Sequence, residues 1–519
     1  MKIRDRLSRQ PAMAMAAGTT LSRATGLGRT LALASVLGLG GLSDAYNLAN
    51  TVPNMFFTLV VGGPIASALV PVLVAARKEG DRSATPAVFT ALVLAAIVAG
   101  MALFAAAPLV IDLLAPSGIG RSDPGRGSAL ATLWLRLFAA QVPLYALSVF
   151  GVGVMTVHGR LAMGALAPVL TNVGIVVAAV GFGVLATQRS TAVRGAPVIV
   201  LGLGTTVAVA ATSLVQIWGA RRVDEGVRFT LRGLSRHPAL AELVRLGAWT
   251  LLYVGVNQVG LAAVTALAST IEGGISAYQW AFMIMQLPYA VVAVSVISAA
   301  VPQLAAADED DVRELLSGPI RTTATLMIPA ALGLVLAAGP LAAVVLGGRG
   351  DPILGNAIRG FGISLVPFCF FQLLCRASYA RRDSRSPAIV NVAVNVVNIA
   401  AAAATFTLTD SAQGRILALT LAHAASYAVG IVLIVGRLRR RTVRGLGVRR
   451  RHLLRPLAAT AAMGGALVPL TVALNHHAVG RGSAFSVVAV TVAVGALAYW
   501  AVGRVIGLRV VDAIHTRAR

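Results

Sequence analysis

The sequence predicts an all-α polytopic membrane protein: about 14 transmembrane helices, two parallel-related six-helix lobes plus two C-terminal helices. Composition, the length of the apolar runs and an internal repeat lead to this prediction. Of the 519 residues, 57% are hydrophobic and 12% are charged, with a mean hydropathy of +0.81, whereas soluble domains are far less apolar. Apolar runs of about 18 residues or more recur along the chain, which is the length that crosses a bilayer as a helix. They are too long for the strands of a membrane barrel.

The apolar runs place the expected helices, and the loops between them divide the chain into segments. The expected spans are 13–41, 45–76, 84–115, 129–157, 161–186, 196–219, 239–269, 275–303, 319–347, 355–380, 386–408, 412–436, 455–474 and 483–508. The expected segments are a cytoplasmic N-terminus (1–12), an N-lobe (13–220), a cytoplasmic inter-lobe linker (221–238), a C-lobe (239–436), a basic cytoplasmic linker (437–454), a final helix pair (455–508) and a cytoplasmic tail (509–519).

Basic residues indicate the orientation in the membrane. A net charge of +25 would suggest nucleic acid as the partner of a soluble protein, but here the basic residues fall in loops between apolar runs. Alternate loops carry stretches such as "ARRVDEGVRFTLRGLSRH" (220–237) and "GRLRRRTVRGLGVRRRH" (436–452), whereas the opposite loops carry scattered arginines. Because Lys and Arg are retained on the cytoplasmic side, we predict that both termini lie in the cytoplasm. Membrane lipids are then the expected neighbours of these loops, and no nucleic acid is expected.

An internal repeat supports the division into two lobes. "SALVPVLVAA" (67–76) and "SAAVPQLAAA" (298–307) share seven of ten residues, and "PVLTNV" (168–173) recurs as "PAIVNV" (387–392). Each pair falls at corresponding positions of two six-span halves with the same orientation. Parallel repeats of this kind belong to transporters that bind the substrate between their halves.

Two arginines lie deep in the first expected span. If that span starts near residue 13, Arg23 lies about 15 Å along it and Arg29 about 24 Å along it, at 1.5 Å per residue. Each would cost about 2.5–3.5 kcal/mol facing lipid, so we expect both to face protein or a watery cavity. One interpretation is structural, with the arginines paired to Asp44 or to backbone carbonyls. The other is an anion site, because a guanidinium binds phosphate bidentately and stays ionised.

A polar stripe follows on the second expected span. Asn47, Asn50 and Asn54 fall at positions i, i+3 and i+7, with Asp44 one turn earlier, so the stripe occupies one helix face. Hydrogen bonding between helices explains such a stripe as well as substrate binding does. The same spacing recurs further along the chain, where we interpret it as helix-to-helix hydrogen bonding: Asn391, Asn395 and Asn398.

Several kinds of chemistry are not predicted. The only lysines are Lys2 and Lys78, neither in a glycine-rich phosphate-binding loop, so ATP hydrolysis by this chain is excluded. Cys369 and Cys375 share one apolar run and are interpreted as packing residues, not as a disulfide or zinc site. No nucleophile, base and acid cluster is visible. We therefore predict no enzyme activity, no cofactor and no metal, and transport driven by a gradient, a potential or a partner.

The motifs "SRATGLGR", "SDAYNLANTVPN", "SALVPVL", "YQWAFMIMQLPYAVVAVSVISAAVPQLA" and "LLCRASYARRDSRSP" together resemble the MurJ/MviN family of lipid II flippases, in the MOP exporter superfamily. The similarity runs in order through most of the chain. It implies two six-helix lobes around a cationic cavity, with a groove for the lipid tail at the last two helices. It also implies a substrate made of an undecaprenyl chain, a pyrophosphate and a disaccharide-pentapeptide, and a role in peptidoglycan biosynthesis, cell shape and the cell wall.

The resemblance also implies site residues. Arg23, Arg29 and Asp44 match functional positions of the family motif, and Arg376 matches the arginine before its "YA" segment. Family members often carry arginines where this chain has Phe57 and Met283. Gln279 and Gln286 are the nearby residues that supply weaker donors. With the stripe on the second span, the candidate substrate-binding residues are Arg23, Arg29, Asp44, Asn47, Asn54, Arg376, Gln279 and Gln286.

We predict a flippase for lipid II that works by alternating access in the cytoplasmic membrane. One alternative is a flippase for another polyprenyl-linked sugar, or a drug or metabolite exporter of the MOP type, for which acidic cavity residues would be expected. An alternative of another class is a non-transporting envelope scaffold with the flippase fold. That scaffold would recruit cell-wall synthesis partners through the basic 437–454 linker.

Overall fold

A computed structural model describes residues 2–59, 66–187, 195–231, 237–290, 304, 309–348, 350–381, 383–441, 451–475 and 479–508. Several expected features fall outside these residues: most of the second copy of the repeated "SALVPVLVAA" segment, residues 442–450 of the basic linker and the tail from residue 509 onward. The described residues form α-helices joined by turns and short loops, without a β-strand among them. The all-α prediction is confirmed.

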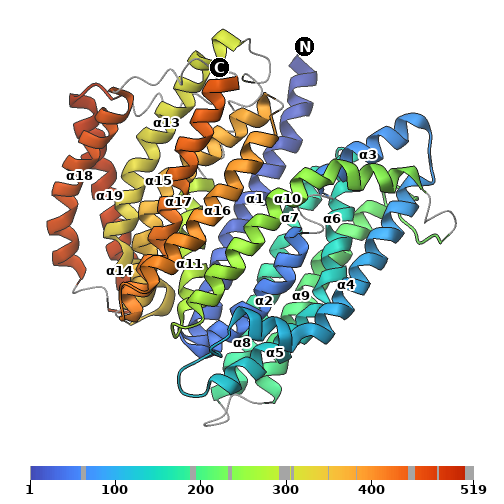
Figure 1. Cartoon of the computed structure of the whole chain (residues 1–519), viewed down its shortest axis with the longest axis horizontal. Coiled ribbons are helices and arrows are strands. Elements are labelled where there is room, and N and C mark those ends of the chain that lie inside the picture. The colour runs from blue at the N-terminus through green and yellow to red at the C-terminus, as the bar shows by residue number, and fades with distance from the viewer. Residues whose placement is uncertain are drawn as a thin grey trace. The chain divides into compact units, whose positions relative to one another are not determined.

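The helices fall into two compact units, Met1–Gln258 and Val259–Arg519, and α10 runs through the boundary between them (Figure 1). The first unit contains α1 (Lys2–Leu37), α2 (Gly41–Phe56), α3 (Ala66–Glu79), α4 (Ala84–Leu114), α5 (Pro124–Ala139), α6 (Gln141–Val157), α7 (Leu161–Leu166), α8 (Pro168–Thr187), α9 (Ala196–Arg221) and the start of α10 (Pro238–Ala268). The second contains the end of α10, α11 (Gly274–Pro288), α13 (Glu309–Leu336), α14 (Ala338–Leu346), α15 (Pro352–Ala380), α16 (Arg385–Phe406), α17 (Ala412–Arg441), α18 (Arg451–Asn475) and α19 (Arg481–Val505).

Eleven helical segments within the described residues are long and apolar enough to cross a membrane, so the chain is a multi-pass membrane protein. They correspond to eleven of the expected spans. The three other expected spans are 13–41, 45–76 and 275–303. The first is one long helix that contains charged residues, whereas the second and third include residues outside the described ranges.

Three of the expected spans are each divided into two helices, and a proline follows every break. Pro168 shows the reason, because proline has no N–H to donate to the carbonyl four residues earlier. That carbonyl belongs to Gly164 and accepts a hydrogen bond from Nε2 of Gln216 on α9 instead, at 3.5 Å. The breaks lie at Ala140, Ala167 and Ala337, and the prolines that follow them are Pro143, Pro168 and Pro340.

The core of the first unit joins α2, α5, α6 and α9. Tyr46 of α2 is fully buried, and its ring meets Trp134 and Phe138 of α5 edge-on at centroid distances of 5.5 and 5.7 Å. Its hydroxyl lies 2.9 Å from Oγ1 of Thr205 on α9. Trp134 donates from Nε1 to the carbonyl of Val198 at 3.0 Å. Each buried polar atom of these aromatic side chains therefore has a partner, as the membrane interior requires.

A core cluster of the second unit joins α15, α16 and α17. Cys375 of α15 is buried with Phe371, Val394 and Ile434 in one apolar cluster. Cys369 is also buried, and neither thiol is in a disulfide. The interpretation of these two cysteines as packing residues is consistent with these positions.

Candidate functional site

The candidate site residues are distributed between the two units. Five of them lie on the first two helices of the first unit, and three lie on two helices of the second. In the first unit they are Arg23 and Arg29 on α1 and Asp44, Asn47 and Asn54 on α2. In the second unit they are Gln279 and Gln286 on α11 and Arg376 on α15.

Arg29 is the arginine that the structure places beside polar core groups. Its side chain is half-buried, and it interacts electrostatically with the hydroxyls of Tyr46 on α2 and Tyr145 on α6. A guanidinium is a strong multiple donor, and phenol hydroxyls are both donors and acceptors. This end of the first unit therefore combines a cation with polar hydroxyl groups that are hydrogen-bonded to neighbouring helices.

Tyr145 is held in place by hydrogen bonds. Its hydroxyl donates to Oε1 of Gln141 at 3.1 Å, and Nε2 of Gln141 reaches Oγ1 of Thr206 on α9 at 3.3 Å. The Asn54 side chain lies within hydrogen-bonding reach of the same hydroxyl. The Phe57 ring packs against that of Tyr145 at 4.8 Å between centroids. Tyr145 thus connects α2, α6 and α9 on the side that meets Arg29.

Arg23 lies in a different environment, because its side chain is exposed. The backbone around it is fixed by Asn172 of α8, whose Nδ2 donates to the carbonyl of Ser22 at 2.9 Å and to Oγ1 of Thr25 at 3.0 Å. Asn172 is one of the residues of the repeated "PVLTNV" motif, so this motif fastens the arginine-bearing helix. The Arg23 guanidinium itself is open to its surroundings.

The acidic and amide residues of α2 are largely buried. Asp44 is 2% exposed and Asn47 is 7% exposed. Asp44 lies in the first turn of the helix, where a carboxylate is favoured by the helix dipole. Nδ2 of Asn54 donates to the carbonyl of Asn50 at 2.7 Å. That Asp44 orients an arginine remains a prediction, and so does substrate contact by the asparagines.

In the second unit the candidate residues lie beside an aromatic cluster. Gln279 and Gln286 are half-buried on α11, and Arg376 is exposed on α15. Between the two glutamines, Phe282 faces Phe361 of α15 at 5.4 Å and His423 of α17 at 5.9 Å. Gln279 and Gln286 lie three and four residues from Phe282, so they share a helix face with a ring of this cluster.

Sequence reasoning did not single out Tyr46, Tyr145 or Gln141. Gln141 and Tyr145 are four residues apart in an otherwise apolar run, which puts them on one helix face. Polar side chains in that position form hydrogen bonds inside a membrane bundle, and this was the available signal. For Tyr46 the sequence offered only its place within "SDAYNLANTVPN", between two residues that were singled out.

Comparisons with known proteins relate the sequence and the fold to one family. The model of the family described as "Lipid II flippase MurJ" matches residues 33–490. A lipid II flippase MurJ of Burkholderia cenocepacia is 28% identical over 395 residues, covering 73% of this chain and 74% of the relative. The matched segment begins after Arg23 and Arg29, so the family match does not include these two arginines.

Solved structures agree on the fold. A lipid II flippase MurJ in an inward closed conformation has a TM-score of 0.75 at 17% identity, covering 95% of this chain and 98% of that chain. An inward-facing multidrug resistance transporter of the MATE family, in the MOP superfamily, has a TM-score of 0.64 at 17% identity, covering 80% of this chain and 94% of that chain. The family match covers most of the sequence, and the chain belongs to the lipid II flippase MurJ family.

Proposed function

We propose that this protein flips the undecaprenyl-pyrophosphate-linked precursor lipid II across the cytoplasmic membrane by alternating access. Membership of the MurJ family over residues 33–490 is the observation that carries the proposal. The position of Arg29 supports it, because a half-buried guanidinium that interacts electrostatically with two tyrosine hydroxyls suits a pyrophosphate that must cross an apolar interior. Lipid II is the proposed partner, and the chain itself performs no covalent step.

We assign the binding roles by residue. Arg23 and Arg29 hold the anionic headgroup, and Asp44 orients one of them while the site is empty. Asn47 and Asn54 donate to the headgroup from α2. Gln279, Gln286 and Arg376 contribute from the second unit. An entering anion relieves the repulsion between the arginines, which gives the differential binding that a ligand-driven change of state requires.

The membrane arrangement is also proposed. Residues 13–220 and 239–436 form two lobes related by a rotation about the membrane normal, and 455–508 add the last two helices. Both termini and the linkers 221–238 and 437–454 lie in the cytoplasm, because their arginines follow the positive-inside rule.

Complementation tests the function. The chain is expressed in a bacterium whose own lipid II flippase is depleted, and growth and membrane levels are followed together. Rescue of growth at a normal membrane level is the expected result. Purified protein in liposomes with fluorescent lipid II then measures flipping directly. Absence of flipping in both assays, with folded protein present, contradicts the proposal.

A second candidate is a non-transporting envelope scaffold of the same fold. The observation that favours it is the aromatic contact between Phe57 and Tyr145, which fills a position where family members often carry an arginine. For a scaffold, Arg29→Ala would leave the cellular phenotype unchanged, whereas removal of the basic 437–454 linker would abolish it. For a flippase, Arg29→Ala would abolish growth rescue.

A further inference from the structure

The segment expected to be the inter-lobe linker, residues 221–238, has contacts with the first unit in its described part. Thr85 of α4 reaches Oδ2 of Asp224 with its hydroxyl at 3.4 Å, and the N–H of Thr230 donates to Oγ1 of Thr90 at 2.9 Å. The Phe229 ring meets that of Phe89 at 5.0 Å between centroids. The described part of the linker after α9 therefore packs along the first turns of α4.

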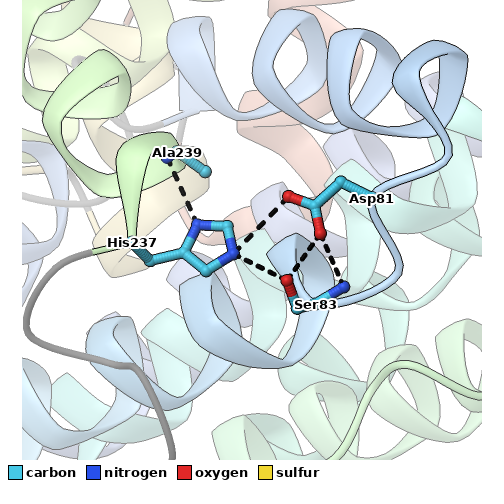
Figure 2. Close-up of polar contacts among 4 residues, drawn as sticks. All are labelled: Asp81, Ser83, His237 and Ala239. Atoms are coloured by element: carbon cyan, nitrogen blue, oxygen red, sulfur yellow. Dashed lines mark hydrogen bonds and ion pairs between the residues drawn. The ribbon is translucent and has the colours of Figure 1, made fainter.

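A second attachment holds the end of the same linker, where α10 begins (Figure 2). Nε2 of His237 lies 3.0 Å from Oγ of Ser83 and 3.5 Å from Oδ2 of Asp81. Asp81 and Ser83 belong to the short loop between α3 and α4. His237 immediately precedes Pro238, the first residue of α10.

The hydrogen bonds of this group form one consistent chain. Nδ1 of His237 accepts from the N–H of Ala239 at 3.3 Å, so in the neutral ring the proton is on Nε2, which donates toward Ser83 and Asp81. The Ser83 hydroxyl in turn donates to Oδ1 of Asp81 at 2.5 Å, and the Ser83 N–H donates to the same oxygen at 2.9 Å. The hydrogen bond from the Ser83 hydroxyl is the main cause that lowers the pKa of Asp81 below its usual value. Asp81 is thus a permanent acceptor at physiological pH.

This geometry is not that of a hydrolase. In a nucleophilic triad the acid and the nucleophile bond to different ring nitrogens, whereas here both Ser83 and Asp81 lie on Nε2 of His237. The other nitrogen is used by the backbone of α10. The cluster therefore joins two segments of chain and has no free base for catalysis.

We propose that Asp81, Ser83 and His237 form a latch that keeps the first turn of α10 fixed to the loop between α3 and α4. With the contacts of Asp224, Phe229 and Thr230, the latch attaches both described ends of the linker, 221–231 and 237–238, to the first unit. Movement of the second unit then leaves the start of α10 in place. The latch concerns conformation, and the proposal does not depend on whether the transported molecule is lipid II.

Spin-label distances test the latch in the full-length protein in lipid nanodiscs. Cys369 and Cys375 are replaced by Ala, and labels are attached to cysteines that replace the exposed residues Glu79 and Ala241. Double electron–electron resonance should give one narrow distance distribution for the protein with an intact latch. A broad distribution in that protein would overturn the proposal, because the linker would already be a flexible tether.

Three single replacements and one double variant separate the latch from local capping. His237→Asn keeps a side-chain acceptor for the N–H of Ala239, since Asn caps helices well, but it is too short to hold Ser83 and Asp81. We expect it to broaden the distribution about as much as Ser83→Ala does, and the double variant to broaden it no further. His158→Ala is the matched control, because Nδ1 of His158 bonds the carbonyl of Val154 in its own helix. Unchanged narrow distributions in both latch variants, or broadening only in the control, would overturn the proposal.

Discussion

The helices α2 and α11 carry candidate site residues in the first and second units, respectively, but their surroundings differ. Around α2 the side chains form a hydrogen-bonded group that Arg29 reaches, with Tyr46 bonded to Thr205 and Tyr145 to Gln141. Around α11 the neighbouring side chains are aromatic rings. The comparison indicates that a cation lies among polar groups in the first unit, whereas the packing around α11 in the second unit is aromatic.

The aromatic cluster around α11 is centred on two buried rings of other helices. Phe361 of α15 meets Tyr278 at 4.9 Å between centroids, and its ring lies 5.2 Å from that of His423. Nδ1 of His423 is bonded to the hydroxyl of Ser364 at 2.5 Å. This cluster is a packing arrangement, and its contribution is to the stability of the second unit more than to charge recognition.

The largest effect is expected for the arginine of the first unit. Arg29→Ala should abolish growth rescue and flipping while membrane levels stay normal, because the charge that offsets the headgroup is lost. Arg29→Lys should retain part of the activity, since charge survives without the bidentate geometry. Arg23→Ala and Arg23→Lys should have the same effects as the corresponding replacements of Arg29. Full transport by both Ala variants would return these arginines to a structural role.

The next effect is on stability, in the second unit. Phe361→Ala should lower the free energy of unfolding by about 3–5 kcal/mol, the usual loss for a buried phenylalanine, because Phe361 is fully buried within the aromatic cluster. Thermal unfolding of the purified protein measures this loss. The protein that remains folded should still flip substrate, and a selective loss of flipping at unchanged thermal stability would contradict the comparison.

A smaller effect is expected for the hydroxyl that faces Arg29. Tyr145→Phe removes the hydrogen bond to the neutral side chain of Gln141, worth up to about 1.5 kcal/mol, so the flipping rate should fall by up to roughly 10-fold. Tyr278→Phe is the matched replacement in the second unit, where the Tyr278 ring packs on Phe361 at 4.9 Å between centroids. We expect that control to stay within about twofold in the same liposome assay. Equal losses in the two variants would remove the distinction between the units.

The smallest effect is expected for the neutral donors of α11. Gln279→Ala and Gln286→Ala should each reduce flipping by about fivefold, because one neutral hydrogen bond contributes about 1 kcal/mol. Initial rates in liposomes at limiting lipid II resolve such a difference. A loss as complete as that of Arg29→Ala would place the main anion site in the second unit instead.

Much of the fold could be predicted from the sequence, because a bilayer imposes simple requirements. Helices that satisfy their own backbone hydrogen bonds must be about 20 residues long and apolar, so eleven of the expected spans are found as candidate spans. The breaks at Ala140, Ala167 and Ala337 depend on prolines that are visible in the sequence, but prolines also occur inside unbroken helices such as α4, at Pro108. Whether a proline divides a span depends on its neighbours, such as Gln216, which compensates the Gly164 carbonyl.

Only part of the candidate site could be predicted from the sequence. The sequence singles out Arg29 because a charge inside an apolar run is energetically costly and can be recognised within one segment of the sequence. The sequence does not single out Tyr145, because its environment is formed by Arg29, Asn54 and Gln141, which come from three different helices.

The sequence by itself determined the membrane class, the helical fold, the family resemblance and the presence of two arginines within an apolar run, since each depends on composition or on residues close together in the chain. Only the tertiary structure decided which arginine meets buried tyrosines, which unit is aromatic, and that His237 bonds Ser83, 154 residues away. Such contacts depend on how helices pack against one another, and packing joins residues whose spacing in the sequence carries no signal.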